Sequence, residues 1–150
     1  MRLVLQRVSR AAVSWDAERN EIGLGLAILV GVGPADDESV SLRLAEKVAQ
    51  LRIFEDGEGK TNRSLQDVGG EALVVSQFTL YADVSRGRRP GFTGAAAPDL
   101  ADRLYRHFAG ALAALGVAVK TGSFGAEMDL ELVNHGPFTV LIDTDSLSRS

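Results

Sequence analysis

Two short segments place polar or conformationally unusual residues where a plain structural role does not require them. The first lies in the hydrophobic stretch 72–81, which includes Ser76, Gln77 and Thr79. If this stretch is a strand, alternation puts Gln77, Thr79 and Tyr81 on one face. Buried Ser and Gln side chains need hydrogen-bond partners, and polar groups at a strand end often line a site. The alternative is a plain strand, with Gln77 at an exposed edge and Thr79 as a β-branched strand former.

The second segment is residues 134–139, which centre on Gly136-Pro137 between two strand-like runs. Glycine permits unusual backbone dihedral angles, and a bond preceding proline adopts the cis form at modest cost. Either property aims carbonyl oxygens outward at fixed positions. An ordinary hairpin turn between two strands is the alternative interpretation.

Ordinary catalytic side chains are scarce in this chain. It has no cysteine, which excludes disulfides, zinc-thiolate sites and cysteine nucleophiles. His107 adjoins the apolar stripe of a predicted helix and is expected on the helix surface. His135 is expected as a turn residue, with a catalytic role as its alternative. Gly59-Lys60-Thr61 lacks the first glycine of a phosphate-binding loop. We expect no metal and no cofactor.

Length and charge narrow the class further. A chain of 150 residues predicts one domain over residues 1–150. A net charge of -4 argues against a broad basic surface that binds nucleic acid, so we expect any contact with nucleic acid to be local. Arg86, Arg88 and Arg89 form the local basic cluster, which either contacts phosphates or is a solvated loop. With no membrane span and no signal peptide in the sequence, we expect a cytoplasmic protein.

Hydrophobic periodicity predicts the elements that must position these residues. Strands are expected over residues 2–8, 12–15, 21–32, 52–54, 73–81, 117–120, 128–133 and 138–143. Helices are expected after the N-cap candidates Asp36 and Asp37, and from Pro98 to a stop at Gly116. Residues 55–70 and 83–98 are predicted loops, and residues 146–150 a frayed tail. This inventory predicts an α/β fold, a layered β/β/α domain with a partly closed, barrel-like sheet and two main helices.

The two segments together resemble the signature pair of the D-aminoacyl-tRNA deacylases: Ser76-Gln77-Phe78-Thr79-Leu80 and Asn134-x-Gly136-Pro137-x-Thr139. The similarity extends to residues 1–8, 51–54, 67–70, 87–92 and 121–128. Phe138 departs from the family pattern, which commonly has Val there. The larger ring either narrows a pocket or repacks behind it.

The resemblance implies an enzyme that hydrolyses the ester between a D-amino acid and the 3′-terminal adenosine of tRNA. It also implies activity on glycyl-tRNA mischarged on tRNA-Ala, and rejection of L-aminoacyl-tRNA. Catalytic residues would be Ser76, Gln77, Phe78 and Thr79, and substrate-binding residues Asn134, Gly136, Pro137 and Thr139. The partners implied are the aminoacyl-tRNA 3′ end and a second copy of the chain, because the family forms homodimers with the active site at the interface.

The resemblance also implies a mechanism. A cis Gly136-Pro137 bond of one subunit enters the site of the other and excludes an L side chain by rigid backbone. Backbone N–H groups of residues 77–79 stabilise the oxyanion, and the substrate 2′-hydroxyl assists the attacking water. Thr79 positions the substrate in preference to attacking it, because no base is visible to activate its hydroxyl.

Two other functions compete with this interpretation. One is a non-catalytic module of the same fold that binds the tRNA end, since fold alone does not decide activity. The other is an esterase or amidase for small D-amino-acid compounds. The lack of a nucleophile–base pair counts against the second.

Overall fold

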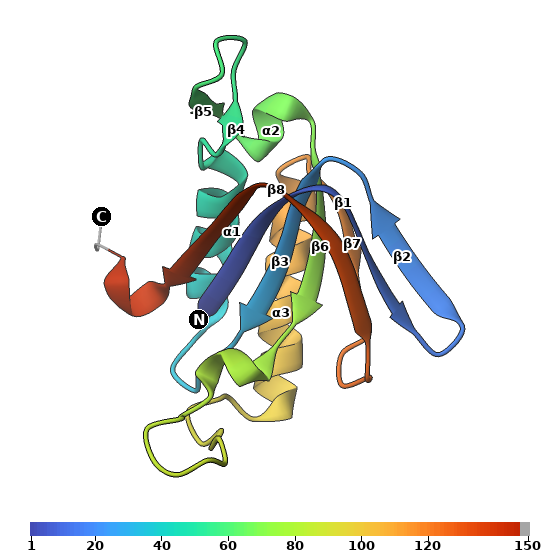
Figure 1. The fold of residues 1–150 in the computed structure, drawn as a ribbon. Helices are drawn as coiled ribbons and strands as arrows, with labels where there is room; N and C mark the ends of the chain where they lie inside the picture. Colours follow the sequence, from blue (N-terminus) through green and yellow to red (C-terminus); the bar gives the residue numbers. More distant parts are fainter. Residues whose placement is uncertain (148–150) are drawn as a thin grey trace.

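The N-terminal strand β1 (Arg2–Trp15) organises the sheet in the computed structural model, which describes residues 1–147. Along one edge it pairs antiparallel with β2 (Glu18–Ile22) and β3 (Gly25–Gly31), and along the other with β8 (Asp129–Asp143). The strands β6 (Glu71–Ser76) and β7 (Ala118–Thr121) extend the sheet beyond β3 in parallel. Figure 1 shows β1 and β8 bending together across this sheet.

Two long helices begin where the sequence predicts, and the second ends at its predicted stop. Helix α1 (Glu38–Gln50) is capped by Asp37, whose side chain accepts a hydrogen bond of 3.0 Å from the Val40 backbone N–H. Helix α3 (Pro98–Ala114) has Pro98 in its first turn, and Gly116 follows it with a φ of 89°. Both lie on the same side of the sheet (Figure 1). Within residues 1–147 no helix is long and apolar enough to cross a membrane.

Residues 55–70 are more ordered than the predicted loop. They contain most of a short antiparallel hairpin, β4 (Phe54–Glu55) with β5 (Thr61–Arg63), so the strand expected over residues 52–54 begins only at Phe54. The one-turn helix α2 (Leu65–Val68) follows. Ser64 and Asp67 form a reciprocal capping box around it, a local signal that accounts for this short helix.

Six other predicted strands need correction, and long-range pairing explains most of the differences. The runs 2–8 and 12–15 form the single strand β1, and 128–133 and 138–143 form the single strand β8, because each half of one pairs with a half of the other. The predicted strand 21–32 is divided between β2 and β3 at residues 23–24. The predicted strand 73–81 ends at Ser76 and continues as the 3-10 helix η1 (Phe78–Tyr81).

The predicted frayed tail, residues 146–150, lies partly outside the described residues. Residues 148–150 are not described by the structure. Ser146 ends a second short 3-10 helix, η2 (Thr144–Ser146), which follows β8 directly. Ser146 therefore belongs to a helical turn and not to a frayed tail.

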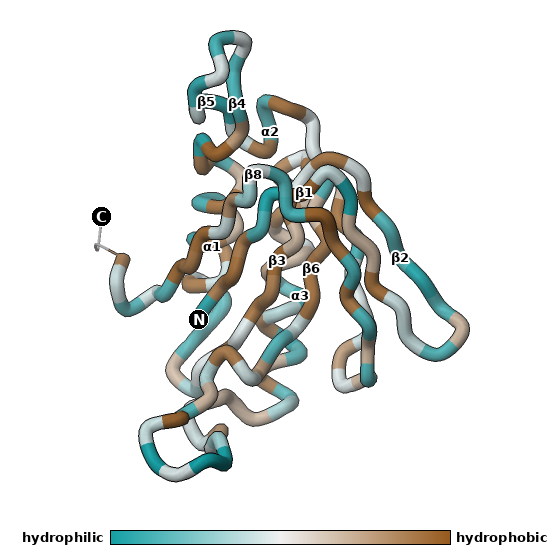
Figure 2. The backbone as a smooth tube through the Cα atoms, viewed as in Figure 1, coloured by the Kyte–Doolittle hydropathy of each residue, from teal (hydrophilic) through white to brown (hydrophobic). Residues whose placement is uncertain are grey.

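Two hydrophobic clusters occupy the two faces of the sheet. The larger one lies between sheet and helices and includes Leu5, Ile28, Leu44 and Phe108. The smaller one lies on the other face and is built around the following residues: Val8, Ala11, Val13, Ile22, Ala27, Leu73 and Val75, with Leu130 and Leu132 of β8 packed against them. Figure 2 shows the apolar residues concentrated along β1, β3 and β6. The predicted α/β fold with a barrel-like sheet and two main helices is confirmed.

Candidate functional site

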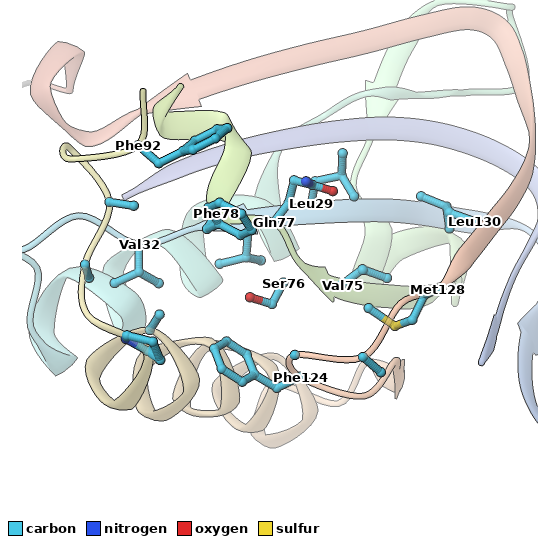
Figure 3. A pocket seen from close by; sticks show the side chains of 17 residues that line it. Leu29, Val32, Val75, Ser76, Gln77, Phe78, Phe92, Phe124, Met128 and Leu130 are labelled. Carbon is cyan, nitrogen blue, oxygen red and sulfur yellow. The ribbon is translucent and has the colours of Figure 1, made fainter. Parts of the chain in front are cut away.

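A cavity of about 610 Å³ opens beside the carboxyl end of β6. Its lining comes from β3, β6, the start of α3 and the loops around residues 92–96 and 124–128. None of the lining side chains is ionisable, and the polar ones are Ser76 and Gln77. The Ser76 hydroxyl points into the cavity (Figure 3). An apolar cavity of this size with few polar groups is typical of a small-molecule or nucleoside site.

The backbone changes direction at this cavity. The Gln77 N–H donates to the Val30 carbonyl (2.8 Å), which extends the ladder by one residue before η1 begins. The prediction that Gln77, Thr79 and Tyr81 share a strand face is therefore wrong. A helix start leaves its first N–H groups without internal partners, and within residues 1–147 no acceptor is found for those of Phe78 and Thr79. The Gln77 N–H was expected to stabilise an oxyanion, but it already donates to the Val30 carbonyl and is not available for that role.

Three of the four predicted catalytic residues line the cavity: Ser76, Gln77 and Phe78. Thr79 lies beside them and accepts a hydrogen bond from the Gln77 side-chain amide. Nothing basic contacts the Thr79 hydroxyl within the described residues. Burial, with the Asp36 carboxylate nearby, raises the pKa of Tyr81, so this phenol is not poised to act as a base. The arrangement offers polar groups for positioning a ligand but no activated nucleophile.

The second motif bulges out of the β1–β8 ladder. Gln6 pairs with Thr139 and Val8 with Asn134, so residues 135–138 of β8 lie opposite Arg7 alone. We call residues 135–138 the extruded segment. Because β8 continues on both sides of it along β1, the hairpin-turn alternative is wrong. The bond between Gly136 and Pro137 is cis, and Gly136 has a φ of 134°.

A buried arginine holds the extruded segment. Arg7 is 5% exposed, and its Nε donates to the His135 carbonyl (3.0 Å) while Nη1 donates to the Ile53 carbonyl (2.9 Å). Its guanidinium carbon lies 4.6 Å from the centre of the Phe138 ring. No ion pair in the described part of the chain includes Arg7. Two backbone carbonyls and an aromatic face thus stabilise this buried charge.

Asn134 and Thr139, predicted to bind substrate, bracket the extruded segment. The Asn134 side chain donates to the Thr139 hydroxyl (2.9 Å) and accepts from the Phe138 N–H (2.8 Å). Phe138 packs against the larger hydrophobic cluster and does not line the cavity of its own chain. The Phe138 ring therefore does not narrow the cavity of its own chain, and it lies over the Arg7 guanidinium.

The structure does not bring the two motifs together within one chain. Gly136 and Pro137 are exposed and do not line the cavity that contains Ser76 and Gln77. The bend of β8 lies at one end of the sheet and η1 at the other (Figure 1). Within its own chain the extruded segment therefore does not contribute to this cavity.

Arg7 was not among the predicted functional residues. The signal was present, because Arg7 continues the inward-facing positions of Leu3 and Leu5 in β1. A charged residue at an apolar position of a strand needs a polar partner. Its partners could not be predicted, because they are backbone groups distant in sequence.

The remaining candidates lie away from the cavity. The His107 Nδ1 lies 3.0 Å from the hydroxyl of buried Ser41, between α1 and α3. The side chain of His135 is exposed next to Gly136. Arg86, Arg88 and Arg89 are exposed in the loop between η1 and α3. The described residues contain no group of three or more His, Asp or Glu side chains placed to hold a metal ion.

Comparison with known proteins decides the family. The model of the D-Tyr-tRNA(Tyr) deacylase family matches residues 4–143. The chain belongs to the D-aminoacyl-tRNA deacylase family. A curated D-aminoacyl-tRNA deacylase of Symbiobacterium thermophilum is 57% identical to this chain over 97% of both chains. One of Deinococcus radiodurans is 56% identical over 95% of this chain and 99% of its own.

Solved structures agree with the deacylase fold. The c-Myc DNA unwinding element binding protein is 35% identical, with a TM-score of 0.89 over 96% of this chain and 99% of its own. A probable eukaryotic D-amino acid tRNA deacylase is 20% identical, with a TM-score of 0.83 over 94% and 97%. At that identity the second likeness shows the fold alone.

Replacement of Arg7 tests whether it fixes the extruded segment. Lysine keeps the charge but lacks the planar fork that reaches two carbonyls. We expect Arg7→Lys to lower the free energy of unfolding by about 1–3 kcal/mol and to accelerate amide hydrogen exchange at Phe138. The matched variant Arg10→Lys, at the exposed pair with Glu131, should change stability by less than about 0.5 kcal/mol. Urea unfolding and exchange mass spectrometry measure both; equal effects of the two variants would contradict this role.

Proposed function

We propose that this deacylase binds the 3′-terminal adenosine of a D-aminoacyl-tRNA in its apolar cavity and hydrolyses the aminoacyl ester there. As a member of its family the chain is an ester hydrolase. The observation that carries the proposal is a nucleoside-sized cavity with no ionisable side chain, bordered by Ser76, Gln77 and the N–H groups that open η1. A cytoplasmic location fits a substrate made by tRNA charging.

The chemistry requires no catalytic acid or base from the protein. An aminoacyl ester is an activated ester, and the neighbouring ribose 2′-hydroxyl positions the attacking water. The water oxygen bonds to the ester carbonyl carbon, the bond from that carbon to the ribose 3′-oxygen breaks, and a proton passes to that oxygen. The N–H groups of Phe78 and Thr79 stabilise the oxyanion between these steps. Ser76 and Gln77 hold the ribose and the amino group.

Rejection of L-amino acids needs a second copy of the chain. Gly136 and Pro137 are exposed and far from their own cavity, yet Arg7 and Asn134 hold them in place. We place them in the cavity of the partner in a homodimer, where their backbone occupies the space of an L side chain. A hydrogen atom meets no such obstacle, so glycyl-tRNA, including that mischarged on tRNA-Ala, is also a substrate.

The direct test compares three substrates. We expect wild-type protein to hydrolyse D-tyrosyl-tRNA and glycyl-tRNA at least about a hundredfold faster than L-tyrosyl-tRNA, because a backbone clash costs about 3 kcal/mol or more. Rates are measured by release of labelled amino acid against a no-enzyme control. Equal rates on D and L esters would refute the chiral filter. Binding without hydrolysis of any ester would instead favour the non-catalytic module.

Replacement of Thr79 distinguishes positioning from covalent catalysis. We expect Thr79→Ala to retain most of its turnover, because no base activates the hydroxyl and its visible role is to accept a bond from Gln77. Thr61→Ala, on the exposed strand β5, is the control for the effect of a threonine-to-alanine change away from the cavity. Stopped reactions are examined by mass spectrometry. An acyl group trapped on Thr79, together with lost turnover in the variant, would contradict the proposal.

The pH dependence follows from the composition of the cavity. Since no lining residue is ionisable, we expect the pH profile of kcat/KM to parallel spontaneous hydrolysis of the same ester from pH 5.5 to 8.5. The nearest histidine is His135 beside Gly136, which the partner would bring to the site. An inflection in the profile that disappears in His135→Gln would contradict catalysis without side-chain acids and bases.

A further inference from the structure

The loop that follows η1 forms a closed structure beside the mouth of the cavity. The backbone N–H of Asp83 donates to the Gly91 carbonyl (2.7 Å), and the N–H of Gly91 donates to the Asp83 carbonyl (2.8 Å). The Asp83 side chain accepts from the Ser85 N–H (2.9 Å). We call residues 83–92 the arginine loop. Its ends are joined by these bonds, so its position relative to the cavity is defined.

The tip of the arginine loop is positively charged. It contains Arg86, Arg88 and Arg89, all exposed, and the one carboxylate of the loop is that of Asp83. None of the ion pairs found within residues 1–147 involves these arginines. This cluster stands out on a chain whose net charge is -4. Uncompensated guanidinium groups of this kind attract phosphate.

Two exposed aromatic rings connect the loop to the cavity. Phe78 is 55% exposed and Phe92 36% exposed, although both are large and apolar. Their ring centres lie 5.0 Å apart in an edge-to-face arrangement, and both rings line the cavity (Figure 3). Exposed aromatic faces beside positive charge are the combination by which proteins bind single-stranded nucleic acid.

We propose that the arginine loop and the Phe78–Phe92 pair form a second nucleotide site, which binds the base and phosphates immediately preceding the terminal adenosine. The inference rests on the proposed function, which places that adenosine in the cavity. The strand leaves the cavity over Phe92, its penultimate base stacks there, and Arg88 and Arg89 contact its phosphates. This extends recognition to the single-stranded end of the tRNA without a broad basic surface.

The smaller pocket on the other side of Phe124 is a less favourable path for the strand. A smaller pocket of about 360 Å³ lies behind Phe124 and is lined by Trp15 and Arg106, among others. The Nε of Arg106 is already bonded to Asp102 (2.7 Å), so its charge is compensated. A strand leaving by that route would meet no free positive charge on Arg106, and phosphate is more strongly attracted to the arginine loop.

The test compares a full substrate with its terminal nucleoside alone. D-Tyrosyl-tRNA engages both sites, whereas D-tyrosyl-adenosine has no preceding nucleotide. Hydrolysis of D-tyrosyl-adenosine by the wild-type protein tests the proposed function by itself, and its absence would overturn that function. The variants below then test the second nucleotide site.

We expect Arg88→Gln/Arg89→Gln to lower kcat/KM for D-tyrosyl-tRNA about tenfold through KM and to leave D-tyrosyl-adenosine within about twofold. The slope of log kcat/KM against log salt should become shallower by about 1.4, the value for two phosphate contacts on a single strand. The control Lys60→Gln/Arg103→Gln removes the same charge from other exposed positions and should leave both substrates unchanged.

Phe92→Ala should reduce activity on the tRNA at least about fivefold more than on the nucleoside, because base stacking is lost. Equal losses on both substrates would overturn the second site, as would unchanged kinetics of the double arginine variant. A tRNA-specific loss in Trp15→Ala/Arg106→Gln, without one in Arg88→Gln/Arg89→Gln, would overturn it by placing the strand in the smaller pocket.

Discussion

A single buried cation determines where the functional backbone lies. The Arg7 guanidinium has no carboxylate partner in the described chain and is solvated by the carbonyls of His135 and Ile53 and by the Phe138 ring. A buried charge that loses its partners is very costly, so displacement of the extruded segment is opposed by the charge as well as by the hydrogen bonds. These contacts with Arg7 hold the irregular part of β8 as a rigid projection of backbone.

The cavity also presents backbone groups in place of ionisable side chains. Its lining contains no ionisable group, and the strand that forms it ends in a 3-10 helix whose first N–H groups are free within residues 1–147. Backbone dipoles are available without protonation and do not reorient when charge develops. The proposed reaction therefore uses fixed backbone on both sides of the ester: N–H groups for the oxyanion, and the partner's carbonyls against an L side chain.

Local signals in the sequence predicted the parts of the fold that depend on neighbouring residues. Asp37, Pro98 and Gly116 correctly mark the boundaries of α1 and α3 because capping is a local interaction. The continuity of β8 was missed because it depends on pairing with β1, more than a hundred residues away. The change from strand to 3-10 helix at Gln77 was missed because Phe78 and Leu80 also suit a strand. The polar residues Ser76 and Gln77 marked the strand end that borders the cavity, but only the family resemblance favoured a site there over a plain strand. The partners of Arg7 could not be predicted.

The central claim is that the extruded segment of one copy completes the cavity of the other. A mixed dimer tests it, with Gly136→Ala in one subunit and Ser76→Phe, which fills the cavity, in its partner. Gly136 has a φ of 134°, which a residue with a Cβ rarely adopts, and the added Cβ would lie 3.0 Å from Arg7 Nη2, so we expect this variant to distort the segment and to lower the selectivity of its homodimer. The open cavity of the purified mixed dimer belongs to the Gly136→Ala subunit. If the partner's segment completes that cavity, its ratio of D-tyrosyl-tRNA to L-tyrosyl-tRNA hydrolysis is that of the wild type. A ratio equal to that of the Gly136→Ala homodimer would contradict it.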